Sequence, residues 1–177
     1  MPFLRAIPLF ALLGFCIPTA AQAQELYAGV YAHAVETPFT FDTNEGGADL
    51  QAGFRFEEID ALAGMQPHVF ASVNLDGDTS FAGAGASWKA ELGRWYIRPG
   101  AGLVVHDAPA LRVDPDTGTR TDLGSRVLFA PELAVGIDLS SRWSVEASWV
   151  HISNARLFNS QQNPGIDMMG LRVNAKL

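Results

Sequence analysis

Two stretches in the second half of the chain decide the fold: VLFAPELAVGIDL at 127–139 and WSVEASWVHI at 143–152. Their odd-numbered positions are mostly apolar, whereas even-numbered positions of the second stretch carry Ser144, Glu146 and Ser148. Successive side chains of a β-strand point to opposite faces. Each stretch is therefore predicted to be a strand with one apolar and one polar face.

The same alternation recurs in about eight segments of about ten residues, separated by turn residues, which is typical of transmembrane barrel strands. The predicted strands cover, roughly, residues 26–34, 49–56, 67–75, 81–92, 95–105, 127–139, 143–152 and 167–177. We therefore predict an all-β fold, an eight-stranded antiparallel transmembrane up-and-down β-barrel whose apolar face points outward.

The lengths of the connections support a barrel in a membrane. Residues 93–94 and 140–142 are tight turns, whereas 35–48, 106–125 and 154–166 are long and polar. Short turns on one side and long loops on the other are usual in outer-membrane barrels. Residues 76–79 depart from this pattern, because an outer loop is expected there and the segment is short.

The first 23 residues have the pattern of a secretory signal peptide. Arg5 precedes an apolar run at 6–17, and Ala21-Gln22-Ala23 is a cleavage site of the A-x-A kind. Cys16, the only cysteine, lies in this segment, so the exported protein has no disulfide. We predict a signal peptide at 1–23, one barrel domain at 24–177 and export to the outer membrane of a Gram-negative cell.

The charge of the chain restricts its partners. Of 12 Lys and Arg, Arg5 leaves with the signal, so eleven basic residues face 19 Asp and Glu and the net charge is −8. Such a surface is a poor partner for nucleic acid. No His, Cys and Asp cluster has metal-ligand spacing, so neither a metal nor a cofactor is expected.

Trp95, Tyr96 and Trp143 are predicted to form an interfacial girdle, with ordinary strand packing as the alternative.

Three polar residues are predicted on the apolar outer wall. His151 is the only one of four histidines with a serine two residues away, and Ser153 lies about 6.6 Å from it along a strand. Both continue the outward odd-numbered series, and Asp167 shares the outward face of the last strand. Ionisable groups that face lipid are costly and tend to mark function. The alternative is a hydrated position in the headgroup region.

A known family shares this arrangement. His151-Ile-Ser153-Asn154-Ala155, with NPGID at 163–167, resembles the last hairpin of the lipid A 3-O-deacylases, outer-membrane barrel enzymes of the PagL type. The resemblance implies that Ser153 is the nucleophile, His151 the general base, Asp167 the orienting acid and Asn154 an oxyanion-stabilising residue. It also implies the substrate, the ester-linked 3-hydroxyacyl chain at the 3-position of lipid A in lipopolysaccharide.

One position departs from the family pattern. The acid of the family is typically a glutamate, and aspartate is one methylene shorter. Asp167 can therefore reach His151 only if its strand lies nearer. Arg156, just past the motif, could contact a lipid A phosphate or be an ordinary solvated loop charge.

Other functions stay open at this point. The chain could be a non-enzymatic eight-stranded barrel of adhesin, anchor or structural type, or an inactive member of the same family. A soluble periplasmic lipid carrier of the lipocalin type would have the opposite facing, apolar inside and polar outside. Contact with outer-membrane lipids is expected, and dimerisation in the membrane is left open.

Overall fold

A computed structural model describes residues 23–40, 43–157 and 163–177. The predicted signal peptide lies outside the described residues except for Ala23, with which the first strand begins. The strands are β1 (Ala23–Ala32), β2 (Ala48–Phe56), β3 (Gln66–Asn74), β4 (Phe81–Ser87), β5 (Ala90–Leu92), β6 (Trp95–His106), β7 (Val127–Phe129), β8 (Glu132–Asp138), β9 (Trp143–Ile152) and β10 (Ile166–Lys176). A 3-10 turn, η2 (Asp60–Leu62), lies between β2 and β3.

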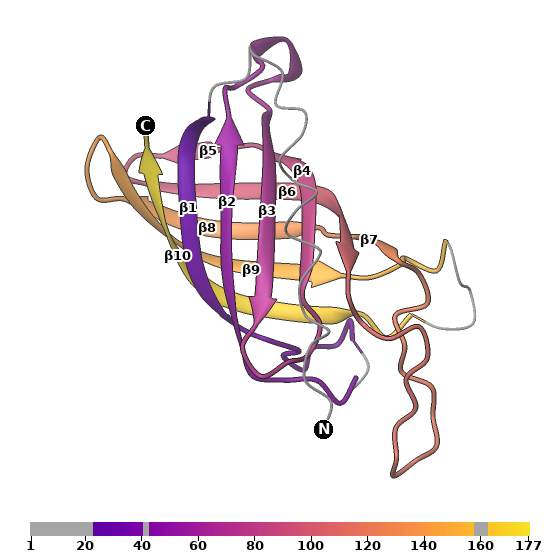
Figure 1. The fold of residues 1–177 in the computed structure, drawn as a ribbon. Coiled ribbons are helices and arrows are strands. Elements are labelled where there is room, and N and C mark those ends of the chain that lie inside the picture. The colour runs from indigo at the N-terminus through magenta and orange to yellow at the C-terminus, as the bar shows by residue number, and fades with distance from the viewer. Residues whose placement is uncertain (1–22, 41–42, 158–162) are drawn as a thin grey trace.

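These strands close into an antiparallel barrel (Figure 1). β1 pairs with both β2 and β10, and β4 pairs with β6 on the other side of the ring. β5 also pairs with β6, so β4 and β5 are two parts of one barrel strand, and the same holds for β7 and β8. The prediction of eight barrel strands is confirmed.

Two predicted strands are interrupted. The segment 81–92 breaks at Trp88–Lys89, and 127–139 breaks at Ala130–Pro131. Proline has no backbone N–H and so cannot donate to a strand ladder, and Pro131 lies at the second break. On the N-terminal side of this break, β7 extends beyond β8 at the long-loop end, and there its Phe129 pairs with Ser153, the residue after β9.

The connections divide between the two ends of the barrel. The loops 33–47, 107–126 and 153–165 lie at one end, where the hairpin between β6 and β7 projects furthest in Figure 1. The turns 93–94 and 139–142 lie at the other end, together with 57–65, which contains η2. The three long loops share one end as predicted, but the division has two exceptions: 75–80 is short at the long-loop end, and 57–65 is longer than a tight turn at the other end.

The two faces of the wall have the predicted polarity. Val135 and Leu171 point outward and are 46 % and 63 % exposed, whereas Glu146 and Arg172 face the interior and are 0 % and 1 % exposed. This facing is the reverse of a lipocalin. The prediction that Tyr96 belongs to the interfacial girdle is wrong. Its even-numbered position turns the side chain inward, where the hydroxyl donates to Ser144 Oγ at 2.9 Å. No helix among the described residues is long and apolar enough to cross a membrane.

The middle of the barrel is filled by charged side chains. Arg55, Arg98 and Arg172 all contact the Glu146 carboxylate, Arg98 through Nε at 2.9 Å and Arg55 through Nη2 at 3.3 Å. Glu25 pairs with Arg55, and Glu132 with Arg172. We call these three arginines and three glutamates the interior network. It satisfies buried charges by pairing them, as burial requires.

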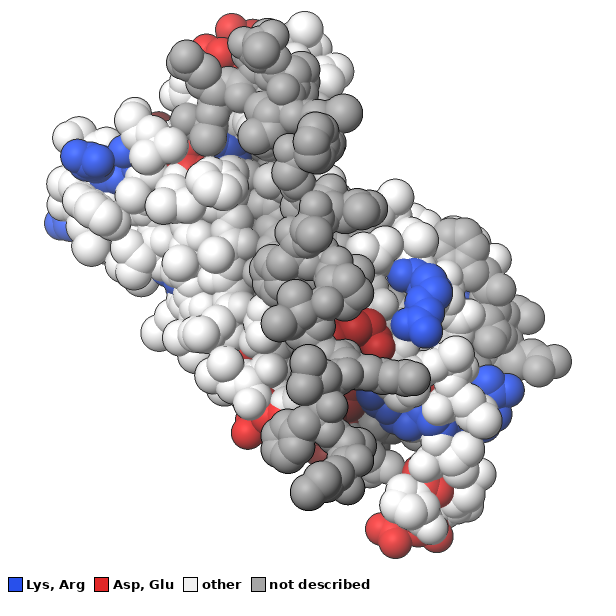
Figure 2. Space-filling model, viewed as in Figure 1, with Lys and Arg blue, Asp and Glu red and all other residues white. Residues whose placement is uncertain are grey.

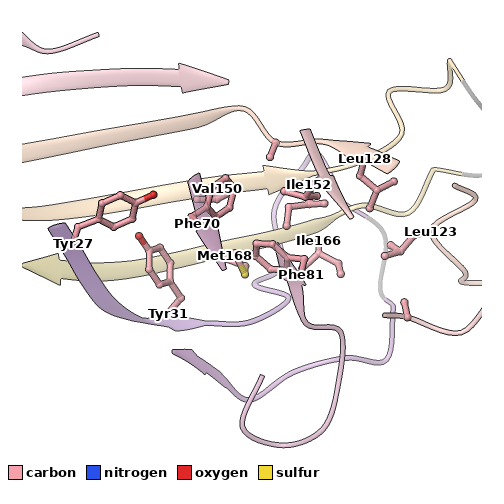
Figure 3. Close-up of a cluster of buried hydrophobic side chains, with 13 residues drawn as sticks. Tyr27, Tyr31, Phe70, Phe81, Leu123, Leu128, Val150, Ile152, Ile166 and Met168 are labelled. Carbon is pink, nitrogen blue, oxygen red and sulfur yellow. The ribbon is translucent and has the colours of Figure 1, made fainter. Parts of the chain in front are cut away.

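Nearer the long loops the interior also holds a cluster of apolar side chains. Figure 3 shows Ile152 of β9 and Ile166 of β10 beside Phe81 and Met168, all pointing into the barrel. The neighbouring odd-numbered residues of β9 and β10 therefore point to the outside. The candidate site lies there.

Candidate active site

The register of β9 and β10 brings the predicted histidine and acid together. Asp167 is the direct partner of His151 across the two strands, next to the inward-facing pair Ile166 and Ile152. Side chains directly opposite each other on neighbouring antiparallel strands have Cβ atoms about 5 Å apart. The last strand is therefore near enough for the shorter acid.

The two side chains form a hydrogen bond. His151 Nδ1 lies 2.7 Å from Asp167 Oδ1. The imidazole side chain is 16 % exposed and the carboxylate side chain is 0 % exposed. With a carboxylate at Nδ1, the neutral imidazole carries its proton there and leaves the Nε2 lone pair to accept another.

Asp167 has two further side-chain donors that the sequence analysis missed. Trp149 Nε1 donates to Oδ1 at 3.0 Å, and Thr37 Oγ1 donates to Oδ2. Trp149 lies two residues before His151 on the same face, so strand parity could have indicated it. Thr37 comes from a loop 130 positions away in sequence, and no local pattern points to it.

Residues 35–39, in the loop that follows β1, contact Asp167 and Trp149 on the outer wall. The Val35 N–H donates to the Asp167 carbonyl at 2.8 Å, and the Phe39 ring lies 5.7 Å from the Trp149 ring. A cavity of about 350 Å³ remains between this loop and the start of β10, with Glu36, Thr40 and Asp167 among its lining residues.

Buried contacts between a histidine and two carboxylates anchor the same loop to the barrel. His33 Nε2 lies 2.7 Å from Glu45 Oε2, and His33 Nδ1 lies 3.0 Å from Asp49 Oδ1. Glu45 also pairs with Arg112 of the loop 107–126. Burial holds the pKa of the Arg112 guanidinium below its ordinary value, and the Asp122 carboxylate offsets only part of this effect. Two long loops are thus joined above the interior of the barrel.

Ser153 lies just after the end of β9 and is held by an isolated bridge to Phe129 of β7. Its backbone exchanges hydrogen bonds with Phe129, N–H to carbonyl at 3.0 Å and carbonyl to N–H at 2.8 Å. The residue is 6 % exposed. Within the described residues no hydrogen bond joins the Ser153 hydroxyl to the His151 ring. Catalytic hydrogen bonds are often long before substrate binds. Rotation of the Ser153 side chain about its Cα–Cβ bond would change the distance between its hydroxyl and the His151 ring.

Comparison with known protein families decides where the chain belongs. The profile of the lipid A 3-O-deacylase (PagL) family matches residues 22–176, nearly the whole chain. The chain belongs to this family. No curated protein sequence matches it.

Solved structures agree with the barrel of this PagL family member. The crystal structure of the outer membrane enzyme PagL has a TM-score of 0.60 at 15 % identity, covering 86 % of this chain and 99 % of that one. Neisserial surface protein A has a TM-score of 0.60 at 9 % identity, with 89 % and 99 % covered. The N-terminal β-barrel domain of Pseudomonas aeruginosa OprF has a TM-score of 0.55 at 10 % identity, with 88 % and 100 % covered. At these identities the likeness shows the fold alone.

Two other predicted residues of the family member lie beside Ser153. Asn154 is 0 % exposed, its Nδ2 donates to the Leu123 carbonyl at 3.0 Å, and its Oδ1 accepts from the Arg156 N–H at 2.7 Å. Asn154 thus ties the segment after β9 to the loop 107–126. Its role at an oxyanion stays a prediction, as does a contact between the exposed Arg156 and a phosphate.

The charge around Asp167 differs from that in the interior network. Its side-chain partners are a hydroxyl, an indole N–H and an imidazole, and none of them is Lys or Arg. Among the described residues no three His, Cys, Asp or Glu side chains are grouped so that they could hold a metal ion. The arrangement can hold a histidine in one tautomer beside a serine.

Proposed function

We propose that this member of the PagL family is a serine-dependent lipid A 3-O-deacylase with Ser153 as nucleophile, His151 as general base and Asp167 as orienting acid. The proposal depends most on one observation, the 2.7 Å contact between His151 Nδ1 and Asp167 Oδ1 on the outer wall. Membership of the lipid A 3-O-deacylase (PagL) family supports this reaction, and the substrate we propose is the ester-linked 3-hydroxyacyl chain at the 3-position of lipid A.

The proposed mechanism is acyl transfer to serine. His151 Nε2 takes the proton of the Ser153 hydroxyl as its oxygen attacks the ester carbonyl. Asp167 holds the imidazole and stabilises the imidazolium that forms. The imidazolium then protonates the sugar oxygen that leaves, and water activated by His151 releases the 3-hydroxy fatty acid from Ser153.

The oxyanion of the tetrahedral intermediate needs a donor, and Asn154 is proposed for this role. Its side chain also bonds the Leu123 carbonyl, so replacing Asn154 would disturb the loop as well as the reaction. Ser153 and Asp167 therefore give cleaner tests than Asn154.

The location of the site suits a substrate in a membrane. The apolar outer wall of the barrel would contact lipid. The proposed residues lie at the long-loop end, which faces the cell exterior in outer-membrane barrels. We propose export, removal of the signal peptide and residence in the outer membrane. A lipid A molecule of the outer leaflet could then meet Ser153 without its acyl chains leaving the bilayer.

The test is the mass of lipid A from Gram-negative cells that express the wild-type chain or Ser153→Ala. The wild-type chain should remove one 3-hydroxyacyl chain, and Ser153→Ala should leave lipid A intact while the barrel still shifts on a gel after heating. Ser141→Ala, in the exposed turn at the opposite end, is the matched control and should keep full activity. Equal deacylation by Ser153→Ala would exclude Ser153 as nucleophile.

An inactive family member is the second candidate. The observation that favours it is the aspartate at position 167, where the acid of the family is typically a glutamate. It predicts intact lipid A from cells expressing the wild-type chain, with the protein folded in the outer membrane. Purified protein incubated with lipid A in detergent micelles separates true inactivity from restraint in the native membrane.

A further inference from the structure

We propose that Thr37 is a positioning residue that holds the Asp167 carboxylate in its productive orientation toward His151. This inference rests on the proposed function, because it concerns how the same site is kept in order. It assigns a task to the loop 33–47, which the sequence motif at 151–167 does not include.

The Thr37 hydroxyl is oriented by its own loop. The Phe39 N–H donates to Thr37 Oγ1 at 3.1 Å, a local turn in which a threonine oxygen accepts from the backbone two residues on. With its oxygen used as an acceptor there, the hydroxyl proton is available for Asp167 Oδ2, which it contacts. The hydroxyl therefore acts as a donor of fixed direction.

Each oxygen of the carboxylate then has its own partners. His151 and Trp149 donate to Oδ1, and Thr37 donates to Oδ2. A carboxylate group turns easily about the last side-chain bond, because the angle of this torsion has a broad distribution. A donor on Oδ2 stops this rotation, so that Oδ1 stays directed at the imidazole. The Asp167 side chain is short and lies opposite His151, so rotation of its carboxylate is the main way in which its oxygens can move relative to the imidazole.

The loop carries Thr37 to this position through several contacts. Val35 bonds the Asp167 backbone at 2.8 Å, and Phe39 packs on Trp149 with ring centroids 5.7 Å apart. At the base of the loop, His33 and Glu45 pair at 2.7 Å with both side chains almost fully buried. The contact of Thr37 with Asp167 is thus supported by Val35 and Phe39 on either side of Thr37, and a positioning residue needs such support to hold its direction.

The first test compares Thr37→Val, which keeps the shape and removes the hydroxyl, with Thr37→Ser, which keeps the hydroxyl. Purified proteins act on lipid A in mixed detergent micelles. We expect Thr37→Val to lower the maximal rate about tenfold, the size of effect that loss of a hydrogen bond to a charged group can cause. The lipid concentration at half-maximal rate should stay unchanged, and Thr37→Ser should keep most of the rate.

A matched control separates this role from a general effect of loop substitutions. Thr119 is an exposed threonine of the loop 107–126, and Thr119→Val should have the wild-type rate. Heat-shifted gel bands and urea unfolding check that all the variants are folded. Should Thr37→Val fail to fold, Thr37→Ala carries the same expectation. An equal loss in Thr37→Ser and Thr37→Val, or no loss in either, would overturn the proposal.

A double mutant identifies the residue through which Thr37 acts. Residues that work as a unit have non-additive effects. In an Asp167→Asn background, Thr37→Val should therefore cost little further activity, whereas independent roles would again give a tenfold loss. Failure of the proposed function has a different outcome, because Ser153→Ala would then deacylate like wild type. An inactive Ser153→Ala with a fully active Thr37→Val would overturn only the role of Thr37.

Discussion

The hairpin of β9 and β10 carries two acid-base pairs, one on each face of the wall. Glu146 and Arg172 are direct cross-strand partners facing inward, and His151 and Asp167 are direct partners facing outward. The Glu146 carboxylate meets three guanidinium groups. The Asp167 carboxylate meets a hydroxyl, an indole and an imidazole.

The difference concerns which groups can exchange a proton. Arginine stays charged in proteins, so the interior network consists of fixed opposite charges and serves to fill the barrel. Among the described residues Asp167 has the His151 imidazole as its basic partner, and a neutral imidazole can both donate and accept a proton. One pair is suited to stability and the other to proton transfer, although the same two strands position both.

The largest effect is expected from Asp167→Asn. The amide keeps the shape of the carboxylate but loses the negative charge and one acceptor oxygen, so the imidazole is no longer held in the required tautomer. In serine triads such a change lowers turnover by roughly 10⁴-fold. Lipid A deacylation rates in micelles measure it, with Asp116→Asn, exposed on the loop 107–126, as the control that stays active. A rate within tenfold of wild type would separate Asp167 from catalysis.

Glu146→Gln should have the opposite profile, a loss of stability with little loss of activity per folded molecule. Removing this charge leaves three arginines facing two glutamates in a buried space, and breaking a buried ion pair costs about 3 to 5 kcal/mol. Urea unfolding in detergent or lipid vesicles measures the free energy of unfolding. Glu91→Gln removes a carboxylate that is 67 % exposed and should change stability by less than about 1 kcal/mol.

The contrast between the two faces also explains what the sequence could predict. Strand parity places His151, Asp167 and the wall residues correctly, because a period of two determines which face each side chain takes. It also indicates the inward position of Tyr96, although the girdle prediction gave weight to residue type over parity. The breaks at Trp88–Lys89 and Ala130–Pro131 needed more than periodicity, although Pro131 was a visible signal.

The rest of the site depends on contacts between distant segments. Thr37 reaches Asp167 from a loop with no periodic pattern, and its path depends on the buried pair of His33 and Glu45. The cross-strand register that allows a short acid at position 167 is likewise set by pairing along the whole hairpin. Neither feature is encoded in a local motif, so the sequence could identify the catalytic candidates but not their support.

Asp167→Glu tests whether the outer pair is adapted to its short acid. Glutamate is the usual acid of the family, yet Asp167 is fully buried among three donors, and an extra methylene in a packed site costs about 1 to 3 kcal/mol. We expect roughly a tenfold loss of deacylation, because the longer side chain displaces its oxygens from Thr37 and Trp149. In this background Thr37→Val should have little effect. A gain in rate would show that the site still favours glutamate.

The smallest effect is expected from Trp149→Phe. This change removes the indole N–H that donates to Asp167 Oδ1 at 3.0 Å and keeps an aromatic ring to pack on Phe39. His151 still donates to the same oxygen and Thr37 to the other, so we expect about a threefold to tenfold loss of turnover, below the full effect of a bond to a charged group. Trp143→Phe, at the turn end of the same strand and 47 % exposed, should be neutral. A loss as large as that of Asp167→Asn would mean that the indole, and not the loop, is the main support of the carboxylate, and would reverse the ranking of Thr37 and Trp149.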